Sequence, residues 1–419
     1  MVINKDISGT PASLRKTHRG MILSLIHAEP GISRVELART CGFSEMAATR
    51  IVRELMAAGI IESSNDTTKD TVQKKHVGRP KTGLHIVNNG LYAVGITVSA
   101  YHSEVSICDA GGKLYASRRL EYASFDSATE AARFYANALR DLINTTGIDA
   151  DRIVGVGVAL SAITSSERSE IVVSEYFGWS NDGGQFCREI EQILDLPVEI
   201  ENISNALAIA EMRFGVARNI EEFTLIHAAI FVGAGVVSGN RLVRGDAGVS
   251  GMLGHFRSEK RPLTCICGRD DCLNLSATGF GLLSQMGKLS HRAFDISKLS
   301  FYAASLLAAL DDPKNSEFVA EAGEKLAPAL DSVSKLLGPK MIILGGHLGA
   351  DDCYFNAVKS AMMEEYDYDP SSSFQLVKST ISSVESAALL ALHAFCYSSE
   401  LDYDRFARLP EQSDVAAHE

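Results

Sequence analysis

The sequence lacks several features that would define its class at once. No apolar run among the 419 residues approaches the roughly 20 that a membrane-spanning helix needs. The first residues, 1–6, lack the hydrophobic segment of a secretory signal. Eight cysteines occur, but only three lie close together, so the disulfide framework of small secreted proteins is excluded. We therefore expect a cytoplasmic protein that does not contact membranes, long enough for two or three domains.

Charge is unevenly distributed along the chain. Residues 1–86 contain 13 Lys and Arg against 8 Asp and Glu, a net charge of +5. Residues 87–419 contain 27 basic and 44 acidic side chains, a net charge of −17 that gives the whole chain its −12. Because nucleic acids attract positive surfaces, this asymmetry favours a nucleic-acid partner for the N-terminal segment alone.

The N-terminal segment has the local signals of consecutive short helices. Apolar residues recur at helical spacing over 14–27, and Glu29-Pro30-Gly31 ends that helix. Ser33 and Glu36 form a capping-box pair. A second helix over 34–40 should follow, and its inward residues are expected to be Val35, Leu37 and Ala38.

A turn at 41–43 joins this helix to a third one, which Ser44 begins and Gly59 ends. Two helices joined in this way are typical of a DNA-binding helix-turn-helix, whose second helix enters the major groove. Early positions of that helix reach bases, and later arginines more often reach phosphates. The alternative is a three-helix packing unit. The candidate DNA-binding residues are Ser44, Glu45, Ala47, Thr49, Arg50 and Arg53.

Two short strands, near 60–63 and 84–86, flank a polar loop that contains Gly78-Arg79-Pro80. A loop of this kind predicts a wing, whose arginine can enter a narrow minor groove. We add Lys74, Lys75 and Arg79 to the candidate DNA-binding residues. A solvated, charged linker is the alternative interpretation.

The most specific pattern in the sequence is H-x9-C-x-C-x4-C, formed by His255, Cys265, Cys267 and Cys272. One nitrogen and three thiolate ligands are typical of a closed, structural zinc site. Gly268 allows a tight turn between the second and third thiols. We expect these residues to hold one zinc ion. The alternatives are a disulfide within the group and four unrelated side chains.

The remainder of the chain repeats one arrangement of strands and helices. A β-hairpin near 91–121 and a helix near 127–144 precede two buried strands at 153–159 and 198–202. A second set opens with a strand over 223–232. Next come a glycine loop at 233–235, helices near 280–288, 297–310 and 315–337, strands at 341–344 and 374–379, and a helix at 384–397. Such a repeat predicts two actin-like lobes with a cleft between them.

The zinc motif and the Gly-Arg-Pro segment resemble those of the ROK family, which comprises repressors, open reading frames and sugar kinases. The resemblance spans nearly the whole chain. It implies an α/β protein, with a winged helix-turn-helix before a two-lobed, actin-like (ribonuclease H-like) sugar-kinase fold. The implied domains are the winged helix-turn-helix over 1–86, a first lobe over 87–205 plus 382–400, a second lobe with the zinc site and a dimerisation surface over 206–381, and a C-terminal tail over 401–419.

The resemblance also implies that catalysis is lost. Family kinases hold ATP phosphates and magnesium with an Asp-x-Gly-Gly-Thr loop, where this chain has Thr97-Val98-Ser99-Ala100-Tyr101. The family's catalytic base is the aspartate of an Asn-Asp pair, and the pair here is Asn202-Ile203. Isoleucine cannot accept a proton from a sugar hydroxyl. We therefore expect no enzyme activity.

The family's sugar-reading carboxylates are also replaced, by Ile203, Met252 and Asn274. The resemblance implies a less polar pocket, in which His255 binds zinc through one ring nitrogen and faces the ligand with the other. The ligand is expected to be a sugar or sugar derivative, although this member could lack an effector. The candidate effector-binding residues are Ser161, Asn202, His255 and Asn274.

The resulting hypothesis is a DNA-binding transcriptional regulator with structural zinc, which represses genes of carbohydrate uptake or catabolism. It would bind a double-stranded DNA operator as a homodimer or tetramer. Two alternatives stay open: an active sugar kinase with an N-terminal DNA-binding extension, and a sensor for which zinc itself is the signal.

Overall fold

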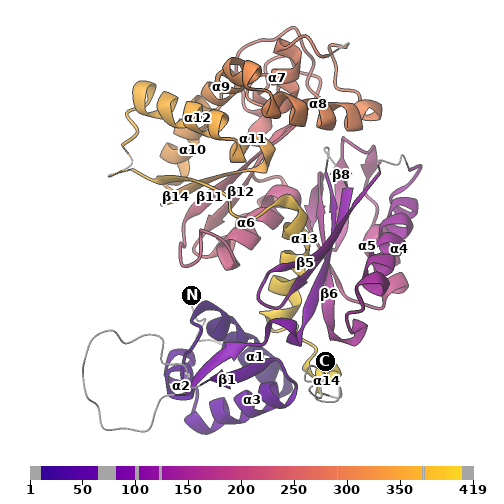
Figure 1. Ribbon diagram of the computed structural model, residues 1–419, viewed down its shortest axis with the longest axis vertical. Coiled ribbons are helices and arrows are strands. Elements are labelled where there is room, and N and C mark those ends of the chain that lie inside the picture. Colours follow the sequence, from indigo (N-terminus) through magenta and orange to yellow (C-terminus); the bar gives the residue numbers. More distant parts are fainter. Residues whose placement is uncertain are drawn as a thin grey trace, which may run out of the picture.

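The computed structural model describes residues 11–64, 82–99, 103–121, 125–289, 291–369, 371 and 373–407. Figure 1 shows a small helical domain at one end of the molecule, followed by two sheets with their own helices. The small domain, residues 11–64 and 82–86, is called the head below. No helix in the described ranges is both long and apolar enough to pass through a bilayer.

The head contains three helices and a two-stranded sheet. Their bounds are α1 Pro11–Ala28, α2 Arg34–Cys41, α3 Glu45–Ala57, β1 Ile61–Ser64 and β2 Gly83–Ile86. The capping box is confirmed, because Ser33 Oγ accepts from the Glu36 amide while Glu36 Oε2 accepts from the Ser33 amide at 3.0 Å. Gly42 ends α2 in the left-handed conformation, with φ of 71°.

One expected inward residue of α2 is wrong. Val35 is 60% exposed, whereas Leu37, Ala38 and Cys41 are buried. With 3.6 residues per turn, these three side chains share one face of the helix and Val35 falls outside it. An apolar residue therefore lies on the solvent side of a helix that is only two turns long.

The first lobe is built on a mixed five-stranded sheet of order β10-β6-β3-β4-β5. Helices α4 and α5 pack together and α13 contacts β3, β4 and β6; α13 and α4 lie on opposite sides of the sheet in Figure 1. The bounds are β3 Tyr92–Val98, β4 Ser103–Asp109, β5 Leu114–Leu120, α4 Ala128–Thr146, β6 Ile153–Leu160, α5 Gln185–Leu194, β10 Val198–Asn202 and α13 Ser383–Ala391. A small antiparallel sheet is added by β7 Ile163–Ser165, β8 Glu170–Ser174 and β9 Trp179–Ser180.

The second lobe repeats the arrangement, with strand order β13-β12-β11-β14-β15. Its elements are α6 Ile203–Arg213, β11 Phe223–Ala228, β12 Val232–Ser238, β13 Arg241–Leu242, α7 Gly279–Gln285, α8 Leu299–Asp311, α9 Ser316–Glu324, α10 Ala327–Leu337, β14 Met341–Gly345, α11 Gly346–Ala350, α12 Asp352–Glu365 and β15 Gln375–Lys378. The single helix expected over 315–337 is two helices, and Pro328 stands in the first turn of the second one.

The expected glycine loop at 233–235 is also wrong, because Gly233 and Gly235 lie inside β12. A Cβ on Gly235 would stand 2.5 Å from the Ser204 carbonyl oxygen and 2.6 Å from the Ala208 Cβ. The glycine is needed because α6 lies directly on this strand. Close helix–strand contact, and not a phosphate loop, explains both glycines.

The chain crosses between the two sheets twice, through α6 and through the segment 379–382 that leads into α13. These two helices pack against each other between the lobes (Figure 1). The buried carboxylate of Glu211, on α6, joins the two crossings. Its oxygens accept from the Val216 amide at 2.7 Å, the Thr380 amide at 2.9 Å and the Ile381 amide at 3.2 Å, and from the Ser379 hydroxyl.

The head shares one continuous hydrophobic core with the first lobe. Ile22, Ile26 and Leu55 of the head belong to the same buried cluster as Leu389 and Leu392 beyond the second sheet crossing. Gly20 of α1 approaches Ser398 so closely that a Cβ would lie 2.1 Å from the Ser398 carbonyl oxygen. The head is therefore packed onto the first lobe without an intervening flexible linker in the described residues.

The C-terminal segment strengthens this junction. Residues 403–406 form the short helix α14, whose Tyr403 and Phe406 are buried. The Tyr403 hydroxyl donates to the Glu54 carbonyl oxygen of α3 at 2.9 Å, and the Arg19 guanidinium lies 3.8 Å from the Tyr403 ring centroid. Part of the segment expected as a tail, 401–407, thus packs against the head.

Candidate functional site

The four residues of the zinc motif converge to a cluster that could hold a metal ion such as zinc. Their ligand atoms all lie within 4.8 Å of one another. The Cys267 and Cys272 sulfurs are 3.4 Å apart, and His255 Nδ1 lies 3.7 Å from Cys265 Sγ and 3.8 Å from Cys272 Sγ. Zn–S bonds of about 2.3 Å and Zn–N bonds of about 2.0 Å give tetrahedral edges of roughly 3.5–3.8 Å, so the donor set fits zinc.

Neighbouring groups support a charged metal–thiolate cluster. Arg269 donates to Cys272 Sγ at 3.1 Å and also to the His255 carbonyl oxygen. Burial raises the pKa of the Cys265 thiol to about 12. Three thiols this close cannot all ionise without a compensating cation, so metal binding would displace their protons. Burial lowers the pKa of His255, which favours the neutral imidazole that metals bind.

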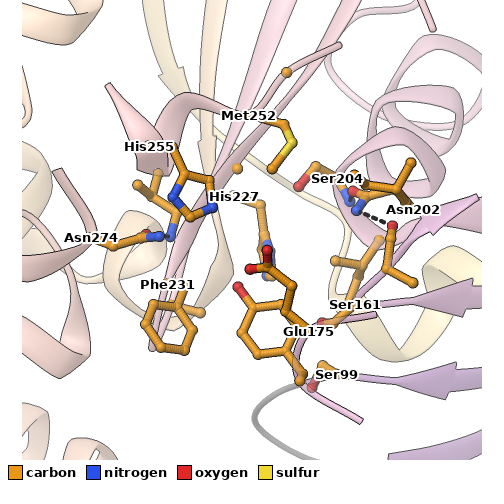
Figure 2. Close-up of a pocket in the computed structure, with 18 of the residues that line it drawn as sticks. Ser99, Ser161, Glu175, Asn202, Ser204, His227, Phe231, Met252, His255 and Asn274 are labelled. Atoms are coloured by element: carbon orange, nitrogen blue, oxygen red, sulfur yellow. Dashed lines mark hydrogen bonds between the residues drawn. The ribbon is translucent and has the colours of Figure 1, made fainter. Parts of the chain in front are cut away.

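The cluster of His255 and the three cysteines borders a cavity of about 140 Å³ between the lobes. Every candidate effector residue, Ser161, Asn202, His255 and Asn274, lines this cavity. Figure 2 shows His255 and Asn274 on one wall and Ser161 and Asn202 on the opposite wall. Since Nδ1 of His255 is directed at the sulfurs, its Nε2 is the ring nitrogen left for the cavity. The four residues are thus brought together by elements of both lobes.

Two of these side chains are already engaged by the protein. Asn202 caps α6 by accepting from the Ser204 amide at 2.8 Å, and its Nδ2 donates to the Ala162 carbonyl oxygen at 2.9 Å. Asn274 is 1% exposed and its Oδ1 accepts from the Val232 amide at 3.0 Å. Both amides therefore shape the cleft, which reduces their capacity to bind a ligand.

Sequence reasoning missed Glu175, which brings a carboxylate to the cavity and is the single acidic residue among the described residues that line it. Glu175 follows β8 and, in Figure 2, points toward the centre of the cleft near His227 and His255. Its negative charge raises the pKa of His255, against the larger effect of burial. The loss of three family carboxylates predicted a less polar pocket, but the carboxylate of Glu175 makes the cavity more polar than that prediction. Tyr176 and Phe231 add an aromatic wall, with ring centroids 5.3 Å apart.

Ile203, which the sequence resemblance predicts to stand at the position of the family's catalytic base, has an apolar side chain. Ile203 is the first residue of α6, lines the cavity and is 5% exposed. At the first strand, Thr97 Oγ1 donates to the Ser383 carbonyl oxygen at 3.1 Å, which ties β3 to α13. Gly346 has φ of +80°, and a Cβ there would lie 2.3 Å from the Ala228 carbonyl oxygen. The contacts of Thr97 and Gly346 are structural. The side chain of Ile203 has no atom that could accept a proton.

The candidate DNA-binding residues of α3 form one outward face. Ser44 Oγ caps the helix by accepting from the Ala47 amide at 3.2 Å. Glu45, Arg50 and Arg53 are exposed, while Ala47 and Thr49 are half-buried. Met46, which sequence reasoning missed, is 83% exposed on the same turn. The wing residues Lys74, Lys75 and Arg79 lie outside the described residues, and the strands that flank them, β1 and β2, pair antiparallel.

The border between the outward and buried faces of α3 carries ion pairs. Glu54 contacts Arg19 of α1 at 2.8 Å and Arg50 of its own helix at 3.9 Å. Arg19 is buried, so its pair with Glu54 fixes α3 against α1. Arg50 remains mostly exposed, because its contact is long and on the surface.

Comparison with known proteins matches both parts of the chain. The ROK family profile covers residues 93–391, and a "Winged helix-turn-helix DNA-binding" profile covers residues 15–62. The xylose repressor of Caldicellulosiruptor bescii is 23% identical over 350 residues, which are 80% of this chain and 84% of that protein. The xylose repressor of Bacillus subtilis is 22% identical over 88% of this chain and 92% of that protein.

Among solved structures, a ROK family transcriptional regulator homologous to the E. coli MLC protein has a TM-score of 0.73 at 21% identity. The match covers 94% of this chain and 99% of that one. A ROK glucokinase from Streptomyces griseus, in complex with glucose and AMPPNP, has a TM-score of 0.57 at 19% identity. It covers 72% of this chain and 98% of its own. The chain therefore belongs to the ROK family, and it joins the family's two-lobed body to an N-terminal winged helix-turn-helix.

Proposed function

We propose that this protein is a transcriptional regulator, a repressor of genes for carbohydrate uptake or catabolism, whose kinase-like body binds an effector without catalysis. The proposal rests on the docked winged helix-turn-helix and on the apolar side chain of Ile203 at the position that the family resemblance assigns to the catalytic base. The xylose repressors to which the chain is similar support the same reading. A side chain without a proton acceptor removes general-base catalysis, typically worth about 10²–10⁴-fold.

The head would read DNA through the exposed face of α3. Glu45, Ala47, Thr49 and Arg50 would contact base edges, and Arg53 would contact phosphate. A homodimer, or a tetramer built from dimers, would present two such helices to half-sites about 10–10.5 bp apart or a multiple of that spacing.

The effector would occupy the cleft between the lobes. Glu175 provides a charge-assisted acceptor for ligand hydroxyls and His255 Nε2 provides a second polar contact, while Tyr176 and Phe231 offer aromatic faces. Polar groups against an aromatic wall suit a sugar or sugar derivative.

Coupling between the cleft and DNA would follow from the lobe arrangement. The head and the first lobe share one core and would therefore move together. Rotation of the second lobe relative to the first lobe would thus also change the position of the second lobe relative to the head. A ligand can drive that movement only if it binds one lobe arrangement more tightly than the other. In a dimer formed through the second lobes, the separation of the two α3 helices would then change.

Zinc would be held by His255, Cys265, Cys267 and Cys272, and when bound it would act structurally. Asn274 links this loop to the body, since its Oδ1 accepts from β12 and its Nδ2 approaches Cys265 Sγ at 4.0 Å. Three of the four ligands are at least half-buried, which favours a permanently bound ion over a sensor. The loop would fix the tautomer of His255 that faces the cleft.

A mobility-shift titration of the purified chain on the DNA upstream of its own gene tests the proposal. We expect a specific shift that competitor DNA does not remove and that a cleft ligand alters. An ATP-coupled assay with common sugars is the companion experiment, and we expect no turnover. Turnover with a sugar, combined with no specific shift at moderate salt, would replace this proposal with the sugar-kinase alternative.

A further inference from the structure

A second, larger cavity lies where the head and both lobes meet. It has a volume of about 480 Å³ and does not share residues with the cleft. Helix α1 contributes Ser24 and His27, and the end of α6 contributes Arg213. The turn after α6 contributes Arg218, and the β12–β13 turn contributes Arg241. The cavity therefore touches the head, the helix between the lobes and the second lobe.

The charge of this cavity is strongly positive. Its lining has three arginines, Arg213, Arg218 and Arg241, and a single carboxylate, Glu221. In the described part of the chain, none of the three guanidinium groups forms an ion pair. Arginine is charged at any physiological pH, so this concentration of charge is not relieved by deprotonation.

The contacts that do exist leave hydrogen-bonding capacity unused. Arg218 Nη2 donates to the His27 and Ala28 carbonyl oxygens at 2.9 and 3.3 Å, which caps the end of α1. Arg213 Nη2 lies 3.4 Å from His393 Nδ1 and has no other polar contact among the described residues. The Asn240 Nδ2, also at the cavity, is buried without a partner.

The two histidines of the cavity, His27 and His393, do not add to this positive charge. Burial, together with the nearby arginines, lowers the pKa of His27 to about 4 and that of His393 to about 3. Both rings are therefore neutral at pH 7, and the positive charge comes from the arginines alone. Arg213 is half-buried, with its guanidinium 5.6 Å from the Tyr397 ring centroid, and Arg218 and Arg241 are exposed. A bound anion would supply the negative charge that no carboxylate of the described residues brings to these three side chains.

We propose that this cavity is a binding site for a small phosphorylated compound, separate from the effector cleft. Guanidinium groups bind phosphate oxygens through paired N–H donors, and three arginines from different segments line this cavity. The cavity has room for an organic group beyond the phosphate. Through Arg213, Arg218 and Arg241, the phosphate would connect the segments that join the head and the two lobes.

The binding assignment does not depend on DNA recognition, although any effect on the operator rests on the proposed function. The test is calorimetric titration of inorganic phosphate into the full-length protein, with chloride at equal ionic strength as reference. We expect saturable binding of one phosphate per chain. Glucose 6-phosphate binding more tightly than phosphate would show that the organic group contributes, whereas unphosphorylated glucose should not compete for this site.

Two variants locate the binding. Arg241→Gln changes an exposed side chain of the β12–β13 turn and should weaken phosphate binding roughly tenfold, the value of one hydrogen bond to a charged group. Arg213→Gln should weaken it at least as much. Arg140→Gln, on the exposed side of α4, is the matched control and should leave binding unchanged. Absence of saturable phosphate binding up to about 10 mM, a concentration that corresponds to a binding free energy of about 3 kcal/mol, would overturn the assignment. Equal affinity of wild type and Arg241→Gln would do the same.

Discussion

Replacing Glu211 by glutamine tests whether the two sheet crossings are held by one carboxylate. Both oxygens of Glu211 are acceptors, and they receive three backbone amides and one hydroxyl. A glutamine can keep only one acceptor end. Its NH₂ group would then oppose the Val216 amide, and the remaining bonds would lose their charge assistance.

The expected cost follows from these contacts. Hydrogen bonds to a charged group contribute about 1.5–3 kcal/mol, and an amide left unpaired in the interior costs about 1–3 kcal/mol. We therefore expect Glu211→Gln to lower the free energy of unfolding of the body by about 3 kcal/mol. At roughly 2–4 °C per kcal/mol for a domain of this size, the thermal midpoint should fall by about 6–12 °C.

Thermal unfolding followed by circular dichroism measures this change, and urea unfolding gives an independent value. Glu364→Gln, an exposed change on α12, is the control and should stay within about 0.5 kcal/mol of wild type. A Glu211→Gln midpoint within about 1 °C of wild type would show that the carboxylate does not stabilise the two crossings.

Other predictions concern the metal, DNA and pH. Purified protein should contain about one zinc per chain by elemental analysis, and Cys272→Ser should lose it and melt at a lower temperature; a metal-free wild type with the same midpoint would refute a structural role. Arg53→Ala should weaken binding to all DNA sequences and reduce the slope of log K against log salt by about 0.9, whereas Thr49→Val should change affinity for the operator only; an unchanged slope would remove Arg53 from the phosphate contacts. Since the pKa of His27 falls to about 4 in the folded state, the unfolded state binds more protons between about pH 6.5 and 4. His27 should thus contribute a decrease in stability of at most about 3 kcal/mol as pH falls over that window, in addition to the decrease from His393, whose pKa is also lowered. His27→Gln should remove the His27 part of the decrease seen in pH-dependent melting.

The features that were predictable from sequence have local causes. The capping box at Ser33 and Glu36 involves neighbours three residues apart, and the four residues of the zinc motif fall within 18 residues of one another. Such patterns need no knowledge of distant packing. The repeated order of strands and helices was sufficient to predict the two lobes, because the apolar face that each element buries is visible in its own sequence.

The features that were missed depend on contacts between distant segments. Glu175 has no local signal, and it reaches the cleft only because β8 and β9 form a small sheet at the edge of the first lobe. Gly235 looked like a loop residue, but α6 requires the absence of a side chain inside β12. The buried roles of Tyr403 and Phe406 arise from pairing the end of the chain with its beginning.

The shared core of head and first lobe has a practical consequence for protein engineering. A chimera that receives only residues 1–86 from a relative would bring new side chains against Tyr397, Leu401 and Phe406. In this chain these three residues belong to one buried cluster with α1 and α3. Exchange of DNA specificity should therefore succeed when the C-terminal residues 397–407 are transplanted together with the head, or when only the outward side chains of α3 are exchanged.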